Sequence, residues 1–496
     1  MSRSSRASRS PLPERPRLAE HVLPRLHVAG ARELVILHDT REGRLVQIGR
    51  REWGLLAAAD GTRDIEGIVL AAARSGSFAK ATALQGFLEQ LHAAGMIEEG
   101  PAGESLADPP PVVPADRPLD PLAGYLLRCD GSGSCCRLYA SVLFSPVEVA
   151  RARALLPSVL DAGDRRSNAF SPERGSGPCA ASAVAQVDGR CAYLADGGLC
   201  SLHAAGGEGG KPLGCRLFPA TFTDDGEAVR VSVAVECACV LASARGGSGG
   251  APLVSEGART RGDLEETVLI DVVPDRVRVS RASSAARGDL VAWSRAVLEV
   301  DPAEASRDVP GSLWALAAAM EAGGLEAGGA RRAFAFASTS PLRAADVRPW
   351  VEALRRRAAR RVEEDAAWRS ERDLARRAVR WIEGAAAILL DPGACEAAIR
   401  GCAEEDRALE AFYVRALVHG HQLVVSGGEG LPLAHALRDR AVRLLVARAL
   451  PAAIARASSE EPGVAPDPAE RYPLALVEAM LRGHGLESYR RDIEGA

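Results

Sequence analysis

Several features that would place the chain in a common class are missing from its 496 residues. No stretch holds the roughly 18 consecutive apolar residues that a membrane-spanning helix needs. The basic N-terminal segment lacks the apolar core of about 7–15 residues found in secretory signals. Serine-nucleophile, nucleotide-binding P-loop and zinc-protease motifs are absent, and a net charge of only −4 creates no field that attracts nucleic acid or anionic membranes. We therefore expect a cytoplasmic protein with no nucleic-acid or membrane partner, whose residues 1–25 form a disordered basic tail.

Cysteines, in contrast, are concentrated in one part of the chain. Nine of the eleven lie between residues 129 and 239: Cys129, Cys135, Cys136, Cys179, Cys191, Cys200, Cys215, Cys237 and Cys239. Disulfides do not persist in a reducing compartment, and thiolates select zinc or iron–sulfur clusters over hard cations. The cluster therefore predicts a centre that binds zinc or an iron–sulfur cluster. Cys395 and Cys402 stand apart in helical sequence, where we expect them to pack as small apolar residues.

Local spacing indicates how the thiols could converge. Gly131 and Gly133 follow Cys129 and allow a tight backbone turn, and the turn Asp196–Gly198 brings Cys191 and Cys200 towards each other. The predicted metal ligands are Cys129, Cys135, Cys136, Cys191, Cys200, Cys215 and Cys237. Three further residues stay open as alternatives: Cys179, Cys239 and His203, which has C-x-x-H spacing with Cys200. For His203 we favour a solvent-exposed position or a hydrogen bond to a ligand.

The apolar pattern predicts a multidomain, mainly α-helical protein. Residues 26–100 predict a small α+β winged helix, in which a hairpin of Leu34–Leu37 and Leu45–Ile48 precedes three helices and a short strand. The remaining segments are a Pro-rich linker at 101–120, an irregular, metal-stapled cysteine domain at 121–242, a Gly/Ser-rich linker at 243–262 and an all-α domain at 263–496. The strongest helical segments of the last domain are 310–322, 346–390, 397–426 and 433–457.

Two patterns in the C-terminal segment have less specific meanings. Acidic residues follow the arginine run 355–361 within one or two turns, which indicates ion pairs on a solvated helix rather than a nucleic-acid surface. His419 and His421 lie in an apolar helical stretch, and two histidines alone are a weak indication of a metal. The sequence carries no prediction of an oligomeric state.

The N-terminal segment resembles the PqqD-like peptide-binding domains. The resemblance covers about 70 residues and is carried by Gln47-Ile48-Gly49, Trp53-Gly54-Leu55-Leu56, Asp60-Gly61-Thr62, and Phe87-Leu88 with Gly95-Met96-Ile97. It implies a surface that takes an extended peptide, or a peptide-bearing protein, by strand addition. The alternative is an ordinary winged-helix core that serves packing alone.

The cysteine segment resembles the YkgJ-type family of zinc- or iron-chelating domains. Its second half carries the family's motifs as Cys191-Ala192-Tyr193-Leu194, Gly198-Leu199-Cys200-Ser201-Leu202-His203 and Cys215-Arg216-Leu217-Phe218-Pro219. The opening CxxCxxCC motif is kept at Cys129, Cys135 and Cys136, but Ser132 stands in place of the second cysteine. The resemblance implies a metal centre in which Cys179 or Cys239 replaces the thiolate lost at Ser132.

The same layout, a cysteine cluster before a long helical region, is similar to that of flagellin lysine N-methylase-like proteins. Three functions follow as hypotheses: a metal-binding protein that supports recognition or modification of a polypeptide, a protein-lysine N-methyltransferase, and a non-enzymatic adaptor held together by structural zinc. Only the methyltransferase requires S-adenosylmethionine. The sequence has no glycine-rich loop for that cofactor between a strand and a helix, and it leaves the assignment as an enzyme open.

Overall fold

Helices dominate the computed structural model: they contain 53% of the described residues, against 16% in strands. The described residues are 11–29, 32–39, 44–74, 77–100, 113–138, 142–157, 169–170, 182–246, 250–265, 268–300, 308–326, 329, 333, 341–366, 369–425, 430–460, 467–482 and 486–494. The chain divides into two compact units, residues 1–110 with 140–192 (unit 1) and residues 111–139 with 193–496 (unit 2). The protein is therefore multidomain and mainly helical, as the sequence predicts.

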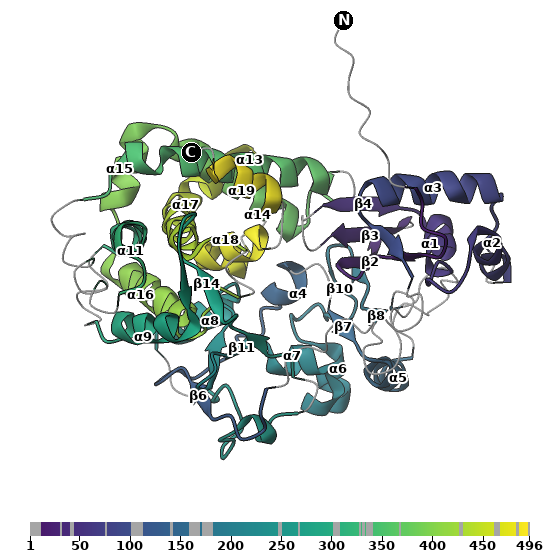
Figure 1. The fold of residues 1–496 in the computed structure, drawn as a ribbon, viewed down its shortest axis with the longest axis horizontal. Coiled ribbons are helices and arrows are strands. Elements are labelled where there is room, and N and C mark those ends of the chain that lie inside the picture. The colour runs from purple at the N-terminus through teal and green to yellow at the C-terminus, as the bar shows by residue number, and fades with distance from the viewer. Residues whose placement is uncertain are drawn as a thin grey trace, which may run out of the picture. The chain divides into compact units, whose positions relative to one another are not determined.

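Unit 1 is built on a sheet of strand order β10-β9-β2-β3-β4 (Figure 1). Its strands are β2 (Val22–Ala29), β3 (Arg32–Asp39), β4 (Leu45–Ile48), β9 (Gln186–Val187) and β10 (Arg190–Cys191). The predicted hairpin is present, with Leu37 opposite Val46 in the antiparallel β3–β4 pair. Strand β9 runs parallel to β2, with Gln186 opposite His27, and this pairing joins part of the segment predicted as a cysteine domain to unit 1.

Three helices pack against this sheet, namely α1 (Arg50–Ala57), α2 (Ile65–Arg74) and α3 (Ala81–Ala93). Leu84, Leu88 and Leu91 recur on one face of α3 and are buried, which explains why this sequence forms an amphipathic helix. Strand β5 (Ile97–Glu99) follows and pairs with β1 (Pro16–Leu18). The other elements of unit 1 are β7 (Leu143–Phe144), α5 (Pro146–Leu155) and β8 (Ser182–Ala183).

The expectation of a disordered tail over residues 1–25 is wrong for its last part. Residues 16–18 form β1, and β2 begins at Val22. Ala19 is 1% exposed and Val22 is fully buried in the core of unit 1. Burial of these apolar side chains, together with the backbone pairing to β5, outweighs the local preference of a segment rich in arginine and proline.

Unit 2 contains a four-stranded sheet of order β13-β11-β12-β6. The strands are β6 (Leu119–Pro121), β11 (Ala220–Asp224), β12 (Val229–Val233) and β13 (Asp271–Val272). Strand β6 begins inside the segment predicted as a linker, and it pairs in parallel with β12, with Pro121 opposite Val231. A hairpin of β14 (Arg276–Arg278) and β15 (Ser284–Ala286) follows, so the segment predicted as all-α opens with short strands.

The remaining helices belong to unit 2. Those of the cysteine segment are α4 (Ser134–Leu138), α6 (Ser201–Gly206), α7 (Leu213–Leu217) and α8 (Ala238–Ala244). Those that follow are α9 (Arg287–Leu298), α11 (Val309–Gly323), α13 (Ala344–Ala366), α14 (Leu374–Leu389), α15 (Pro392–Arg400), α16 (Glu404–His419), α17 (Leu433–Glu460), α18 (Pro473–Leu481) and α19 (Leu486–Glu494). None of the described helices is both long and apolar enough to cross a lipid bilayer.

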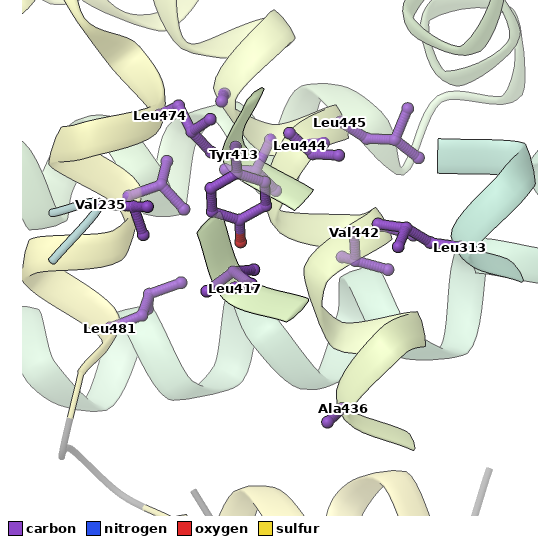
Figure 2. Close-up of a cluster of buried hydrophobic side chains, with 14 of the residues drawn as sticks. Val235, Leu313, Tyr413, Leu417, Ala436, Val442, Leu444, Leu445, Leu474 and Leu481 are labelled. Atoms are coloured by element: carbon purple, nitrogen blue, oxygen red, sulfur yellow. The ribbon is translucent and has the colours of Figure 1, made fainter. Parts of the chain in front are cut away.

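A single apolar core joins the cysteine segment to these helices. It contains Cys237, Cys239, Val240 and Leu241 together with residues of α11, α13, α14 and α16–α18. In Figure 2 the ring of Tyr413 lies among the side chains of Val235, Leu417, Leu444, Leu474 and Leu481. These residues come from the segment after β12 and from α16, α17 and α18. The helical region therefore forms one core with the chain segment that carries the cysteines.

Candidate metal centre

A glycine-rich loop after β6 shapes the first part of the site. Gly131 and Gly133 have φ angles of 70° and 66°, a region that glycine adopts without strain. A Cβ atom on Gly133 would lie 2.7 Å from Leu194 Cδ1 and 2.9 Å from the Gly198 carbonyl oxygen. The loop therefore packs directly against the turn that precedes Cys200, as the two glycines predict.

Parallel strand pairing brings Cys129 and Cys239 together from distant parts of the sequence. Pro121 of β6 lies opposite Val231 of β12, and the two strands run in the same direction. Each cysteine lies eight residues beyond its strand's paired residue, from 121 to 129 and from 231 to 239. The chain therefore leaves both strands at the same end of the sheet and reaches each cysteine after the same number of residues.

Three donor groups converge at this point: the thiols of Cys129 and Cys239 and the carboxylate of Asp130. Their ligand atoms all lie within 4.8 Å of one another, and this is the only such group of three or more in the described part of the chain. Asp130 Oδ1 accepts hydrogen bonds from the Cys239 thiol at 3.2 Å and from the Ser132 amide at 2.9 Å. Cys129 and Asp130 are exposed, whereas Cys239 is 8% exposed, so the site opens to solvent on one side.

Three more thiols surround this group. Cys237 immediately precedes α8, is 6% exposed and hydrogen-bonds to Cys239. Cys135 and Cys136 lie in α4 with their Sγ atoms 3.9 Å apart. Cys135, Cys136 and Cys237 are thus further thiols in the chain segments that carry the converging group, but they do not belong to the group of donors within 4.8 Å.

Three of these thiols, those of Cys129, Cys135 and Cys239, have a raised pKa and hold their protons strongly. The hydrogen bond with Cys239, followed by burial, raises the pKa of Cys129 well above its usual value. The hydrogen bond with Cys136 and burial do the same to the pKa of Cys135. Burial alone would raise the pKa of Asp130, but hydrogen bonds from Ser132 and Cys239 outweigh it and lower that pKa. A divalent cation reverses this balance, because it stabilises the thiolates that otherwise repel one another.

The other predicted ligands have different positions. Cys200 lies at the start of α6 and Cys215 lies in α7; both are half-buried, and neither belongs to a described group of three or more donors within 4.8 Å. Cys191 ends β10 of unit 1. His203 is exposed on α6, and Cys179 lies outside the described residues. No disulfide joins any of the ten described cysteines.

Two of the three converging residues were not among the predicted ligands. The sequence offers Cys239 only as an alternative ligand and does not predict Asp130. The signal for Asp130 was its position directly after Cys129, in a turn where its carboxylate can accept backbone hydrogen bonds. The signal for Cys239 is the parallel register of β6 and β12, which is not visible in the sequence.

The donor set fits a thiolate-preferring metal. Zinc takes cysteine sulfur and aspartate oxygen in four-coordinate sites, and Cys129, Asp130 and Cys239 supply three donors beside a fourth, Cys237. The Asp130 carboxylate is held by the Ser132 amide and the following loop by the two glycines, so the groups are oriented before a metal binds. Comparison of the chain with family models, curated proteins and solved structures found no match in any of the three.

Proposed function

We propose that this protein binds zinc through Cys129, Asp130 and Cys239, with Cys237 as a further ligand, and that the metal supports recognition or modification of a polypeptide. The observation that carries the proposal is the convergence of three donor atoms within 4.8 Å, from two chain segments more than 100 residues apart. Such a group has a chemical use when a cation binds there, because the cation stabilises the thiolates beside the carboxylate.

Zinc is favoured over an iron–sulfur cluster by the mixed donor set. Iron–sulfur clusters are held mainly by four cysteine thiolates, whereas zinc accepts aspartate beside cysteine. Here a carboxylate takes part in the converging group, and Ser132 stands where a further cysteine would extend it. Cys135 and Cys136 provide the additional thiolates that an iron–sulfur cluster would require, so direct metal analysis distinguishes the two assignments.

The polypeptide role rests on the resemblance of residues 26–100 to PqqD-like winged helices. A hairpin, three helices and a short strand follow one another in unit 1 in the order this resemblance implies. Strand β4 pairs with β3 and is an edge of the described sheet, where an extended peptide could add as a further strand. Binding of a peptide in this way should slow hydrogen exchange of the β4 amides. Peptides that slow exchange in other segments and not in β4 would contradict this role. We place this activity in the cytoplasm, where the thiols stay reduced.

The metal assignment is tested by anaerobic purification and elemental analysis of four proteins. We expect about one zinc per chain in the wild type and in Cys395→Ser, the control variant, whose cysteine is buried in α15 away from the site. Cys129→Ser and Cys239→Ser should each lose most of the metal. Iron with acid-labile sulfide in the wild type would show that the centre is an iron–sulfur cluster and not a zinc site. Unchanged metal content in both site variants would refute the ligand set.

A further inference from the structure

Unit 2 contains a second candidate site, separate from the cysteines. A pocket of about 800 Å³ is lined by residues of β6, β12, α9, α11 and α16. This volume is in the range of sites that hold small organic molecules, roughly 300–1,000 Å³. None of its lining residues belongs to the candidate metal centre.

Most of the pocket wall is apolar. Val297, Leu313, Phe412 and Val414 contribute side chains from three helices. Phe412 stacks on Tyr125, with ring centroids 5.2 Å apart and an angle of 24° between the planes, so this wall has a fixed position. Apolar walls of this kind take the hydrocarbon part of a ligand, because its transfer from water is favourable.

Two buried polar side chains interrupt the apolar wall. Ser312 is 5% exposed and lines the pocket. His419 is 8% exposed, and its Nε2 lies 3.0 Å from the Asp120 carbonyl oxygen. Because a carbonyl only accepts, Nε2 carries the hydrogen, and this bond fixes the ring against the pocket. Ser312 places a hydroxyl, which can donate a hydrogen bond to a ligand, in this otherwise apolar wall.

The charges around the pocket favour an anionic group. Arg230 is neutralised within the protein, since it forms ion pairs with Asp120 and with Asp225, the latter at 2.6 Å. Arg415 differs: it donates one hydrogen bond of 2.7 Å to the Ala123 carbonyl and has no acidic partner among the described residues. Its guanidinium is thus the one lining cation, among described residues, whose charge is not balanced by a carboxylate.

We propose that this pocket binds a small organic carboxylate with an apolar body. The hydrocarbon part lies against Leu313, Phe412 and Val414, and the carboxylate accepts hydrogen bonds from Arg415 and from the Ser312 hydroxyl. A guanidinium binds carboxylates well because its planar N–H groups match their two oxygens. The site is independent of the metal centre and of the function proposed for it.

Isothermal titration of the full-length protein with three ligands of equal chain length tests the charge. Octanoate, 1-octanol and octylamine differ in the head group alone. We expect octanoate to bind about tenfold or more tightly than octanol, the ratio typical of a charge-assisted hydrogen bond, and octylamine to bind most weakly. Equal affinities for octanoate and octanol, or no heat of binding from octanoate at millimolar concentration, would overturn the proposal.

Three variants test the location. Arg415→Gln should abolish the advantage of octanoate over octanol, whereas Arg407→Gln, two turns earlier on α16 and outside the pocket, should preserve it. Ala411→Trp places an indole in the pocket and should weaken binding of both ligands at least tenfold. Arg415 is exposed, so its variant should keep the thermal midpoint of the wild type. Octanoate binding unchanged in both Arg415→Gln and Ala411→Trp would place the ligand elsewhere and refute the site.

Discussion

Replacing Glu478 by glutamine should destabilise unit 2 by several kcal/mol. Glu478 lies in α18 and is 5% exposed. Its Oε2 accepts hydrogen bonds from Arg440 at 2.6 Å and Arg443 at 3.0 Å, and its Oε1 accepts one from the Tyr413 hydroxyl at 2.6 Å. Burial and the neighbouring carboxylate raise the pKa of Tyr413 well above its usual value, so its hydroxyl remains a donor. Figure 2 shows this tyrosine ring enclosed by aliphatic side chains.

The magnitude follows from the charges that remain. Arg443 is fully buried and Arg440 is 3% exposed, so Glu478→Gln removes a contacting carboxylate from two buried guanidinium groups, both of which also lie within 4 Å of Asp439. Breaking a buried ion pair on one side costs about 3–5 kcal/mol. The stability of a typical domain is about 5–15 kcal/mol, so the loss should be plain in an unfolding curve.

A surface pair provides the matched control. Arg355 and Glu383 lie 2.8 Å apart, but their side chains are 46% and 29% exposed, so Glu383→Gln should cost less than about 1 kcal/mol. Urea unfolding followed by tryptophan fluorescence measures both variants, since every tryptophan except Trp53 belongs to unit 2. If the two substitutions lowered the urea midpoint equally, the buried network would not have the role given to it here.

Four further outcomes can be measured on the same protein. Asp130→Asn keeps a hydrogen-bond acceptor but removes a charged ligand, so competition with a chromophoric chelator should show zinc affinity at least about tenfold weaker. Gly133→Ala places a methyl group 2.7 Å from Leu194 at a φ of 66°, so zinc content should fall along with stability. A strong chelator should lower the urea midpoint of the wild type but not of Cys239→Ser, and equal shifts would contradict the site. Burial would raise the pKa of Asp225, but hydrogen bonds from His421, nearby amides and Arg230 outweigh it and hold that pKa below the ordinary value. Its stabilisation is therefore complete above about pH 4, the ordinary aspartate value, and is lost as the pH falls through the lower folded value; Asp225→Asn should flatten this acid dependence of the urea midpoint.

Elements defined by local periodicity could be predicted from the sequence. The hairpin of β3 and β4, the three helices of unit 1, and α11 and α17 lie within or close to their expected ranges, because apolar residues recur at strand or helix spacing. The predicted helical segment 397–426 instead covers the end of α15 and the whole of α16, with a break at residues 401–403. The predicted helical segment 346–390 is two helices, since α13 ends at Ala366 and α14 begins at Leu374. A buried ion pair between Arg369 and Asp365 lies at this break, which periodicity alone does not reveal.

The arginine run of α13 was only partly predicted. Arg355 pairs with Glu383 at the surface, and Arg361 forms the expected i,i+4 pair with Asp365 at 2.8 Å. Arg357, however, is 2% exposed, and its guanidinium lies 4.9 Å from the centre of the Tyr489 ring. Arg361 is also buried, at 6% exposed, so two of the five arginines leave solvent. Local spacing alone does not reveal which two, because their burial depends on the helices packed against α13.

The position of the candidate metal centre depends on contacts that are distant in sequence. Local spacing suggested Cys129, and the glycine turns after it have the expected conformation. The partner residue, Cys239, is set by the register of a parallel strand pair between β6 and β12. A shift of that register by one residue would move Cys239 relative to Cys129 and would also turn the strand's side chains to the other face of the sheet.

The same register connects metal binding to the core of unit 2. Helix α8 carries Cys239 in its first turn, while Val240 and Leu241, the next two residues, are buried in the core with α16 and α18. A metal held by Cys129 and Cys239 therefore connects the loop after β6 to the first turn of α8, directly before the residues of α8 that lie in that core. Binding that requires the folded arrangement stabilises it by RT ln(1 + [M]/Kd), about 4 kcal/mol when free metal exceeds Kd a thousandfold. The stabilisation should reach the helical core as well as the loop, because the core and the ligands share one short helix.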